Sequence, residues 1–205
     1  MHASVALMDI GFGFDLEDPA PDGVRMWSGE EFDRLVEHGF FEDEHVELLH
    51  GWLVTMSPQG EPHSRITGWL QHVFARALDL TYDIRGHSTF AVARDSRPEP
   101  DLSVAMRDRA LVGYPRRALL LIEVSESSLR KDREIKLPLY AKAGVPEYWI
   151  VDLKASAVEV HTEPTPKGYR RVTVCRAGDV LRPLQLPAVA IPVSEIPFEP
   201  RGPDR

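Results

Sequence analysis

The stretch Ala-Leu-Leu-Leu-Ile-Glu-Val at residues 118–124 contains the longest uninterrupted aliphatic run of the chain, which ends at Glu123. A continuous aliphatic run is typical of a strand in the middle of a sheet, because both of its faces are covered. The run is far shorter than the roughly 20 apolar residues that span a bilayer. The stretch therefore predicts a central strand in a folded, soluble protein, with an acidic side chain at the apolar end of that strand.

Further strands and helices are predicted on both sides of this run. Short apolar or alternating segments predict strands, and apolar residues at a 3.6-residue period predict helices. The strands are expected at residues 46–49, 52–54, 88–93, 102–106, 118–124, 147–152, 158–162 and 169–175, and the helices at 28–39, 63–80 and 132–142. This order predicts an α/β (mixed α+β) domain in which helices flank a central sheet with mainly antiparallel strands.

Two of these elements carry strong local signals. Ser28 stands three residues before Glu31, which is the spacing of a capping box at a helix start. His50-Gly51 separates two short apolar runs, and a glycine in that place favours the tight turn of a β-hairpin. Both elements are therefore expected near the N-terminal end of the folded region.

Composition divides the chain into three predicted parts: a flexible acidic arm over 1–26, a folded domain over 27–182, and a Pro-rich edge strand and tail over 183–205. The net charge of −8 is unevenly spread. Residues 1–50 carry thirteen acidic side chains and only two basic ones, whereas residues 51–205 carry a net charge of +3. The acidic end is either a solvated surface or a cover for a basic cleft, and the overall charge does not exclude a nucleic-acid partner.

Several chemistries and compartments are disfavoured. The eight histidines include no His-Glu-x-x-His pair, and the chain has neither a Walker loop nor a Gly-x-Ser-x-Gly elbow. The single cysteine, Cys175, cannot form an internal disulfide, and no basic segment precedes an apolar stretch at the N-terminus. We therefore expect a cytoplasmic protein without a membrane partner.

Two carboxylates occupy positions where a charge is costly to bury. Asp101 opens the strand predicted at 102–106, and Glu123 lies at the end of the most apolar strand. If these strands are neighbours, the two side chains meet at one end of the sheet and form an oxygen-rich site suited to Mg²⁺ or Mn²⁺. The alternative is structural: an Asp that caps a turn and a Glu paired at a strand end.

Lys136 is the candidate cation for the same site. It lies on the segment that follows the Glu123 strand, and a helix returning across the sheet brings its ammonium toward the carboxylates. Phosphodiester cleavage needs a metal that activates water together with a cation that balances the developing negative charge. A lysine among charged neighbours on a helix is also commonly just solvated, and that alternative stays open.

The order and spacing of these residues resemble a known family. The motifs that carry the resemblance are Met56-Ser57-Pro58, His63-Ser64, Pro100-Asp101, Ile122-Glu123-Val124-Ser125, Asp132, Lys136, Tyr140 and the long segment Ala143 to Asp152. Together they resemble the bacterial Uma-type restriction-endonuclease-like family of the PD-(D/E)xK nuclease superfamily. The likeness runs from about Trp27 to Leu181, so the folded region over 27–182 is expected to be a nuclease domain.

The resemblance implies a restriction-endonuclease-like core and an endonuclease that hydrolyses DNA with Mg²⁺, for which Mn²⁺ can substitute. It implies Asp101 and Glu123 as metal ligands with the Val124 carbonyl as an additional one, Glu47 as an extra acid, and Lys136 as the catalytic cation. His63, Arg130 and Lys131 are candidate substrate contacts. Because cleavage of both strands of a duplex usually needs two active sites, a homodimer is expected.

The sequence also departs from the simplest pattern of the superfamily. Ser125 stands two residues after Glu123, where that pattern has lysine, and Pro138 would kink a helix unless it lies in the first turn. These departures, with the net negative charge, support a second hypothesis. The chain is then a catalytically weak or inert module that binds nucleic acid or protein and retains the nuclease fold.

Overall fold

The computed structural model describes residues 22–56 and 58–198. The chain forms two compact units: residues 1–58 with 89–99 make up the first, and residues 59–88 with 100–205 make up the second. Most of the predicted acidic arm, residues 1–21, lies outside the described residues. Within the range 27–182, for which the sequence predicts one domain, the structure thus distinguishes two units.

The first unit contains the predicted capped helix and hairpin. Helix α1 (Gly29–Glu37) begins with the capping box, in which the Glu31 N–H donates to Ser28 Oγ (3.3 Å) and the Ser28 N–H donates to Glu31 Oε2 (3.0 Å). Strands β1 (Val46–Leu49) and β2 (Trp52–Thr55) pair antiparallel. His50 and Gly51 both have positive φ, 50° and 81°, as the two-residue hairpin turn requires. These predictions are confirmed.

Arg97 ties the segment 89–99 to α1 within the first unit. Its guanidinium donates from Nε and Nη2 to Asp33 (3.0 Å each to the nearest oxygen) and from Nη1 to the carbonyls of Ala93 (2.7 Å) and Ser96 (3.1 Å). Gly29 lies so close that a Cβ at this position would fall 2.2 Å from the guanidinium carbon. The buried arginine therefore joins two segments that are far apart in the sequence by donating hydrogen bonds to both.

Replacing Arg97 with methionine is expected to lower the free energy of unfolding by about 3 kcal/mol, because Asp33 and two carbonyls lose a buried partner. Urea denaturation of the purified variant measures this loss. Arg94→Met is the matched control, since Arg94 is exposed and three residues away in the same segment. Equal stability of the two variants would contradict the structural importance of the Arg97 contacts.

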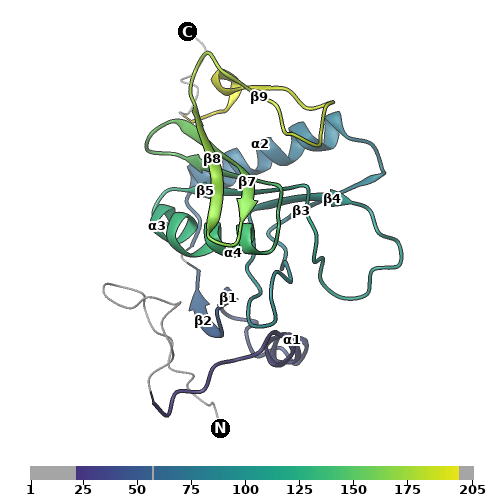
Figure 1. The fold of residues 1–205 in the computed structure, drawn as a ribbon, viewed down its shortest axis with the longest axis vertical. Coiled ribbons are helices and arrows are strands. Elements are labelled where there is room, and N and C mark those ends of the chain that lie inside the picture. Colours follow the sequence, from purple (N-terminus) through teal and green to yellow (C-terminus); the bar gives the residue numbers. More distant parts are fainter. Residues whose placement is uncertain (1–21, 57, 199–205) are drawn as a thin grey trace. The chain divides into compact units, whose positions relative to one another are not determined.

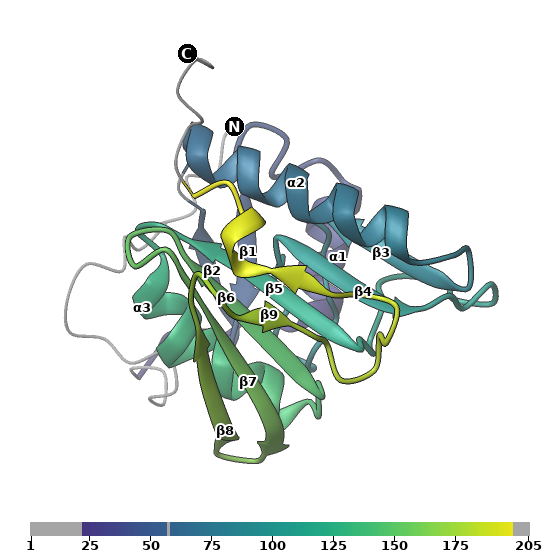
Figure 2. The ribbon, with the colours of Figure 1, turned by 90° about the horizontal axis from the view of Figure 1, so that it is seen from above.

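The second unit is built on a six-stranded mixed sheet. Its strands lie side by side in the order β3, β4, β5, β6, β7, β8, and β5 and β6 run parallel while the other neighbours are antiparallel (Figures 1 and 2). The bounds are Tyr82–Gly86, Leu102–Met106, Leu120–Ser125, Glu147–Asp152, Ala157–Thr165 and Gly168–Cys175. All six residues of β5 are buried, as the aliphatic run predicts. The predicted α+β class with a mixed central sheet is confirmed.

Helices cover both faces of this sheet. Helix α2 (Glu61–Ala77) crosses one face, where its residues Ile66, Leu70 and Phe74 are fully buried against the strands (Figure 1). The segment between β5 and β6 covers the other face as α3 (Leu129–Lys131), the π-helix η1 (Asp132–Lys136) and α4 (Leu137–Lys142). No helix in the described ranges is long and apolar enough to cross a membrane.

The C-terminal segment differs from the prediction of a loose end. Strands β9 (Val180–Leu181) and β10 (Ile191–Pro192) pair antiparallel, and the 3₁₀ turn η2 (Val193–Glu195) follows. The Leu184 N–H donates to the buried carboxylate of Glu147 (2.6 Å). Five apolar side chains of the segment join the main core, namely Leu186, Val189, Ile191, Val193 and Ile196. Spaced apolar residues therefore anchor this Pro-rich segment.

The prediction of a strand over residues 88–93 is wrong. Residues 88–93 form no strand of the sheet, and β3 lies earlier, at Tyr82–Gly86. β3 pairs with β4 over five residues, from Tyr82 opposite Met106 to Gly86 opposite Leu102. The more apolar run at 88–93 leads instead into the first unit, so tertiary pairing outweighed local hydrophobicity here.

Candidate active site

Asp101 and Glu123 come from neighbouring parts of the sheet: Asp101 directly precedes β4, and Glu123 belongs to β5. β4 and β5 pair antiparallel with Leu102 opposite Ile122, so the residue before β4 lies opposite Glu123. Directly opposed residues of an antiparallel pair share one face of the sheet. Both acids are buried, with 6% and 4% of their surface exposed. The prediction that these two strands are neighbours is confirmed.

Asp101 is held by hydrogen bonds on both of its oxygens. The backbone N–H of Val124 donates to Oδ2 (2.7 Å), and Nε2 of His63 lies 3.0 Å from the same oxygen. Nδ1 of His87 and the amide nitrogen of Gln59 lie 3.4 Å from Oδ1. Burial alone would raise the pKa of Asp101, but the contacts from the two histidines and Val124 outweigh it and lower the pKa well below its ordinary value. Asp101 is therefore a fixed carboxylate.

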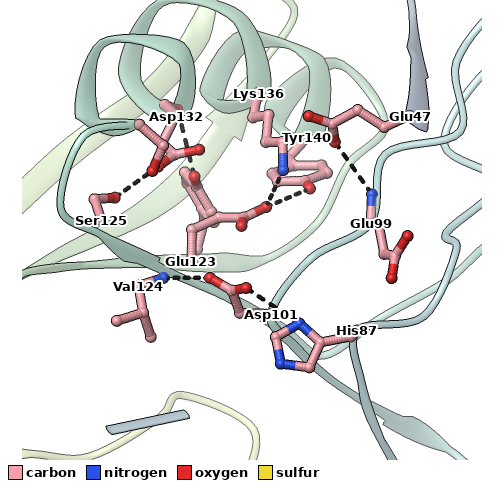
Figure 3. A network of polar contacts seen from close by, with 12 residues as sticks. Glu47, His87, Glu99, Asp101, Glu123, Val124, Ser125, Asp132, Lys136 and Tyr140 are labelled. Carbon is pink, nitrogen blue, oxygen red and sulfur yellow. Dashed lines mark hydrogen bonds and ion pairs between the residues drawn. The ribbon is translucent and has the colours of Figure 1, made fainter. Parts of the chain in front are cut away.

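Glu123 receives two donors from the helical segment on the same face. The Lys136 ammonium donates to Oε1 (2.9 Å), and the Tyr140 hydroxyl donates to the same oxygen (2.9 Å; Figure 3). Lys136 is 2% exposed and Tyr140 is fully buried. An ammonium and a carboxylate buried together stabilise each other's charge. The structure thus pairs Lys136 directly with Glu123, while Asp101 directly precedes the strand beside Glu123.

The placement of Lys136 follows from the form of the helix. Lys136 is the last residue of the π-helix η1, and Pro138 follows two residues later, at the beginning of α4. Tyr140 follows four residues after Lys136 on the same side of the segment.

His63 lies in the first turn of α2, after Pro62, and points to Asp101. Its Nδ1 is 3.5 Å from Thr67 Oγ1, one turn further along the helix. The side chain is 11% exposed, so it is not a surface histidine. The structure thus places His63 beside Asp101. Its role as a substrate contact stays a prediction.

Comparison with known proteins agrees with this arrangement. A family model described as "Uma2: Putative restriction endonuclease" matches residues 30–194, which include every predicted site residue. The chain belongs to the Uma2 family. The fold is also similar to a crystal structure described as "a putative nuclease belonging to DUF820", from Anabaena variabilis ATCC 29413. That likeness has a TM-score of 0.66 and 16% identity, and covers 83% of this chain and 97% of the other. No curated protein matches the chain.

The predicted family is therefore confirmed, and membership of the Uma2 family supports nuclease function in general terms. The identity to the solved structure is too low to carry more than the fold. The roles of individual residues in this Uma2-family chain consequently depend on the geometry of the site.

The remaining predicted site residues are Glu47, Arg130 and Lys131. Glu47 belongs to the first unit, where it is buried in β1 and its Oε2 accepts from the Glu99 N–H (3.3 Å; Figure 3). Arg130 is exposed on α3 and pairs with Glu134 (2.7 Å), and Lys131 beside it is half-buried. Their roles as extra acid and as substrate contacts stay predictions.

The donor atoms of the site suit a hard, oxygen-seeking cation. In the ranges that the structure describes, no three His, Cys, Asp or Glu side chains cluster in a way that would hold a metal. Mg²⁺ does not need such a cage, because it is commonly held by one or two carboxylates and keeps several waters. Asp101, Glu123 and the carbonyl of Val124, the residue after Glu123 on β5, supply oxygen donors that fit Mg²⁺ or Mn²⁺ bound by few protein ligands.

Some residues of the site were not singled out for roles in the sequence. His87 reaches Asp101 from the position directly after β3, and Gln59 reaches it from the loop before α2. Nothing local in the sequence predicts that these two side chains meet at Asp101. Tyr140 was recognisable from its spacing of four from Lys136. The Asp132 carboxylate accepts a hydrogen bond from the Ser125 hydroxyl of β5.

Proposed function

We propose that this Uma2-family protein is a metal-dependent endonuclease that hydrolyses phosphodiester bonds of DNA. The observation that carries the proposal is the buried contact between Lys136 and Glu123, opposite Asp101 on the neighbouring strand. Two carboxylates from neighbouring strands, with an ammonium paired to one of them, combine a cation site with a fixed positive charge. Hydrolysis of a phosphodiester needs both.

Asp101, Glu123 and the Val124 carbonyl would hold the ion, which we propose is Mg²⁺ with Mn²⁺ as a substitute. When bound, such an ion lowers the pKa of a coordinated water and neutralises charge on the phosphate. The site favours oxygen-seeking ions because its carboxylates and carbonyl supply oxygen donors alone. His63 lies within hydrogen-bond distance of Asp101, and we assign it the orientation of that carboxylate rather than coordination.

The protein's own groups supply orientation and charge. The Val124 N–H and His63 fix the carboxylate of Asp101, and Tyr140 fixes that of Glu123. Lys136 holds a positive charge at the point where negative charge grows on the phosphate as the water attacks. Because these groups are buried and already hydrogen-bonded, little reorganisation accompanies the reaction.

The alternative of an inert binding module arises mainly from Ser125 at the position where the superfamily pattern has lysine. The contact of Lys136 with Glu123 supports catalysis over that alternative, since the cation reaches the acid from the helix instead of the strand. We further propose a cytoplasmic homodimer in which each chain contributes one site for one strand of duplex DNA. Elution of only monomers from a sizing column in the presence of DNA would count against this dimer.

The experiment that tests the proposed function combines metal binding and cleavage. Calorimetry with Mg²⁺ and Mn²⁺ is run beside incubation of a supercoiled plasmid, a linear duplex and an RNA, each with and without EDTA. We expect binding of the ion and EDTA-sensitive nicking of the plasmid. Metal binding without cleavage of any of these nucleic acids, or no binding of either ion, would favour the inert module.

A further inference from the structure

The helical segment that carries Lys136 contains one turn of π-helix. The Leu137 N–H donates to the Asp132 carbonyl, five residues back, instead of the usual four. Pro138 supplies a reason for this turn, because a proline ring inside a continuous α-helix collides with the carbonyl four residues before it, here that of Glu134. The extra residue rotates the following side chains by about 100° around the helix axis relative to an uninterrupted α-helix.

Asp132 fastens the beginning of this π turn to the sheet. Its Oδ2 accepts from the Ser125 hydroxyl of β5 (2.6 Å) and from the Ser128 hydroxyl (2.7 Å). Its backbone carbonyl, besides bonding Leu137, accepts from the Tyr148 hydroxyl of β6 (3.3 Å). Asp132 is 1% exposed. The first residue of the π turn is thus attached to the two central strands, and Lys136 is its last residue.

This arrangement is costly as a purely structural device. Burial raises the pKa of Asp132, while the charge of Lys136 and the hydroxyls of Ser125 and Ser128 oppose the rise. A buried carboxylate with two hydroxyl partners is seldom more stabilising than apolar packing of the same volume. Ser125 lies two residues after Glu123 on the same strand, so both side chains point to the same face. The carboxylate that fixes the turn and the carboxylate that receives Lys136 are therefore anchored to one strand.

We infer that Asp132 is a positioning residue: by fastening the π turn to Ser125 of β5, it holds the Lys136 ammonium against Glu123. The catalytic consequence rests on the proposed function, whereas the placement of Lys136 does not. Without the Asp132 carboxylate, the π turn loses its side-chain attachment to β5. The turn can then shift away from the sheet and carry the ammonium away from Glu123. The lysine then becomes accessible to solvent for part of the time.

Labelling of lysine amines, followed by mass spectrometry, tests the placement without any substrate. In the wild type we expect Lys136 to react slowly and the exposed Lys142 to react fast. Asp132→Ala should raise the labelling rate of Lys136 about tenfold or more and leave that of Lys142 unchanged. Asp132→Asn keeps an oxygen acceptor for the serine hydroxyls and should restore most of the protection. Glu134→Ala is the matched control, because it removes an exposed acid from the same turn.

The cleavage assay adds a readout that general destabilisation would not produce. In Asp132→Ala, kcat should fall about tenfold or more while KM for DNA and the affinity for Mg²⁺ stay close to the wild-type values. If Asp132→Ala does not fold, Ser125→Ala should still give a smaller rise in Lys136 labelling. Unchanged labelling in the folded Asp132→Ala or Ser125→Ala variant overturns the inference. Altered labelling in a protein that cleaves no nucleic acid would sustain the positioning role and overturn the proposed function.

Discussion

Replacing Lys136 with methionine should reduce DNA cleavage by about 10²–10³-fold, the loss typical of one preorganised charge-stabilising group. Methionine has a similar length and can fill the buried space, but it provides no charge near the phosphate. Binding of Mg²⁺ is expected to persist, because Asp101 and the Val124 carbonyl are unchanged and Tyr140 still donates to Glu123. Single-turnover cleavage and calorimetry on the same preparation separate these two effects.

The same variant should be less stable when no metal is present. Loss of the ammonium removes the positive charge that Lys136 places beside the buried Glu123 carboxylate, whereas the Tyr140 hydroxyl still donates to it. Breaking such a pair on one side typically costs about 3–5 kcal/mol. Lys142→Met is the control, since Lys142 is exposed at the end of α4. Cleavage by Lys136→Met at the rate of Lys142→Met would remove Lys136 from the active site.

Replacing Asp101 with asparagine should abolish metal-dependent cleavage, with a loss of about 10³-fold or more, because the neutral amide is a poor ligand for Mg²⁺. The fold should persist, since the asparagine oxygen can still accept the Val124 N–H that bonds Asp101 at 2.7 Å. Calorimetry is expected to show no heat of Mg²⁺ binding. Asp108→Asn removes the same charge from an exposed loop and should behave as the wild type.

The acid side of the stability profile provides a second check on Asp101. Its lowered pKa means that the carboxylate stabilises the metal-free fold above the ordinary value of 3.8, and that this contribution disappears as the pH falls below 3.8. Asp101→Asn should therefore be less stable than the wild type at pH 7, and the difference should shrink toward pH 3. Urea denaturation at both pH values measures it. A difference that is constant with pH would show that the charge of Asp101 does not stabilise the fold.

The spacing of residues in the sequence predicts one feature of the site but not another. The pairing of Asp101 with Glu123 was predictable, because two short strands joined by one loop pair in antiparallel register and bring acids at their open ends together. The contact of Lys136 with Glu123 could not be predicted from spacing in the same way, because a solvated lysine fits the sequence equally well. Lys136 ends a π turn whose first residue, Asp132, is bonded to Ser125 of β5 and Tyr148 of β6, and residue spacing alone does not predict such contacts.

The sequence by itself determined the elements whose signals are local. The capping box of α1, the His50-Gly51 turn, the amphipathic α2 and the buried run of β5 depend on residues a few positions apart, and all of them form as predicted. The tertiary structure alone decided three other features. It selected residues 82–86 over 88–93 as the strand beside β4, brought the C-terminal apolar residues into the core, and directed His63 and Lys136 to the two acids. These features depend on partners 13 or more residues away, and burying side chains against such partners contributes more free energy than local preference does.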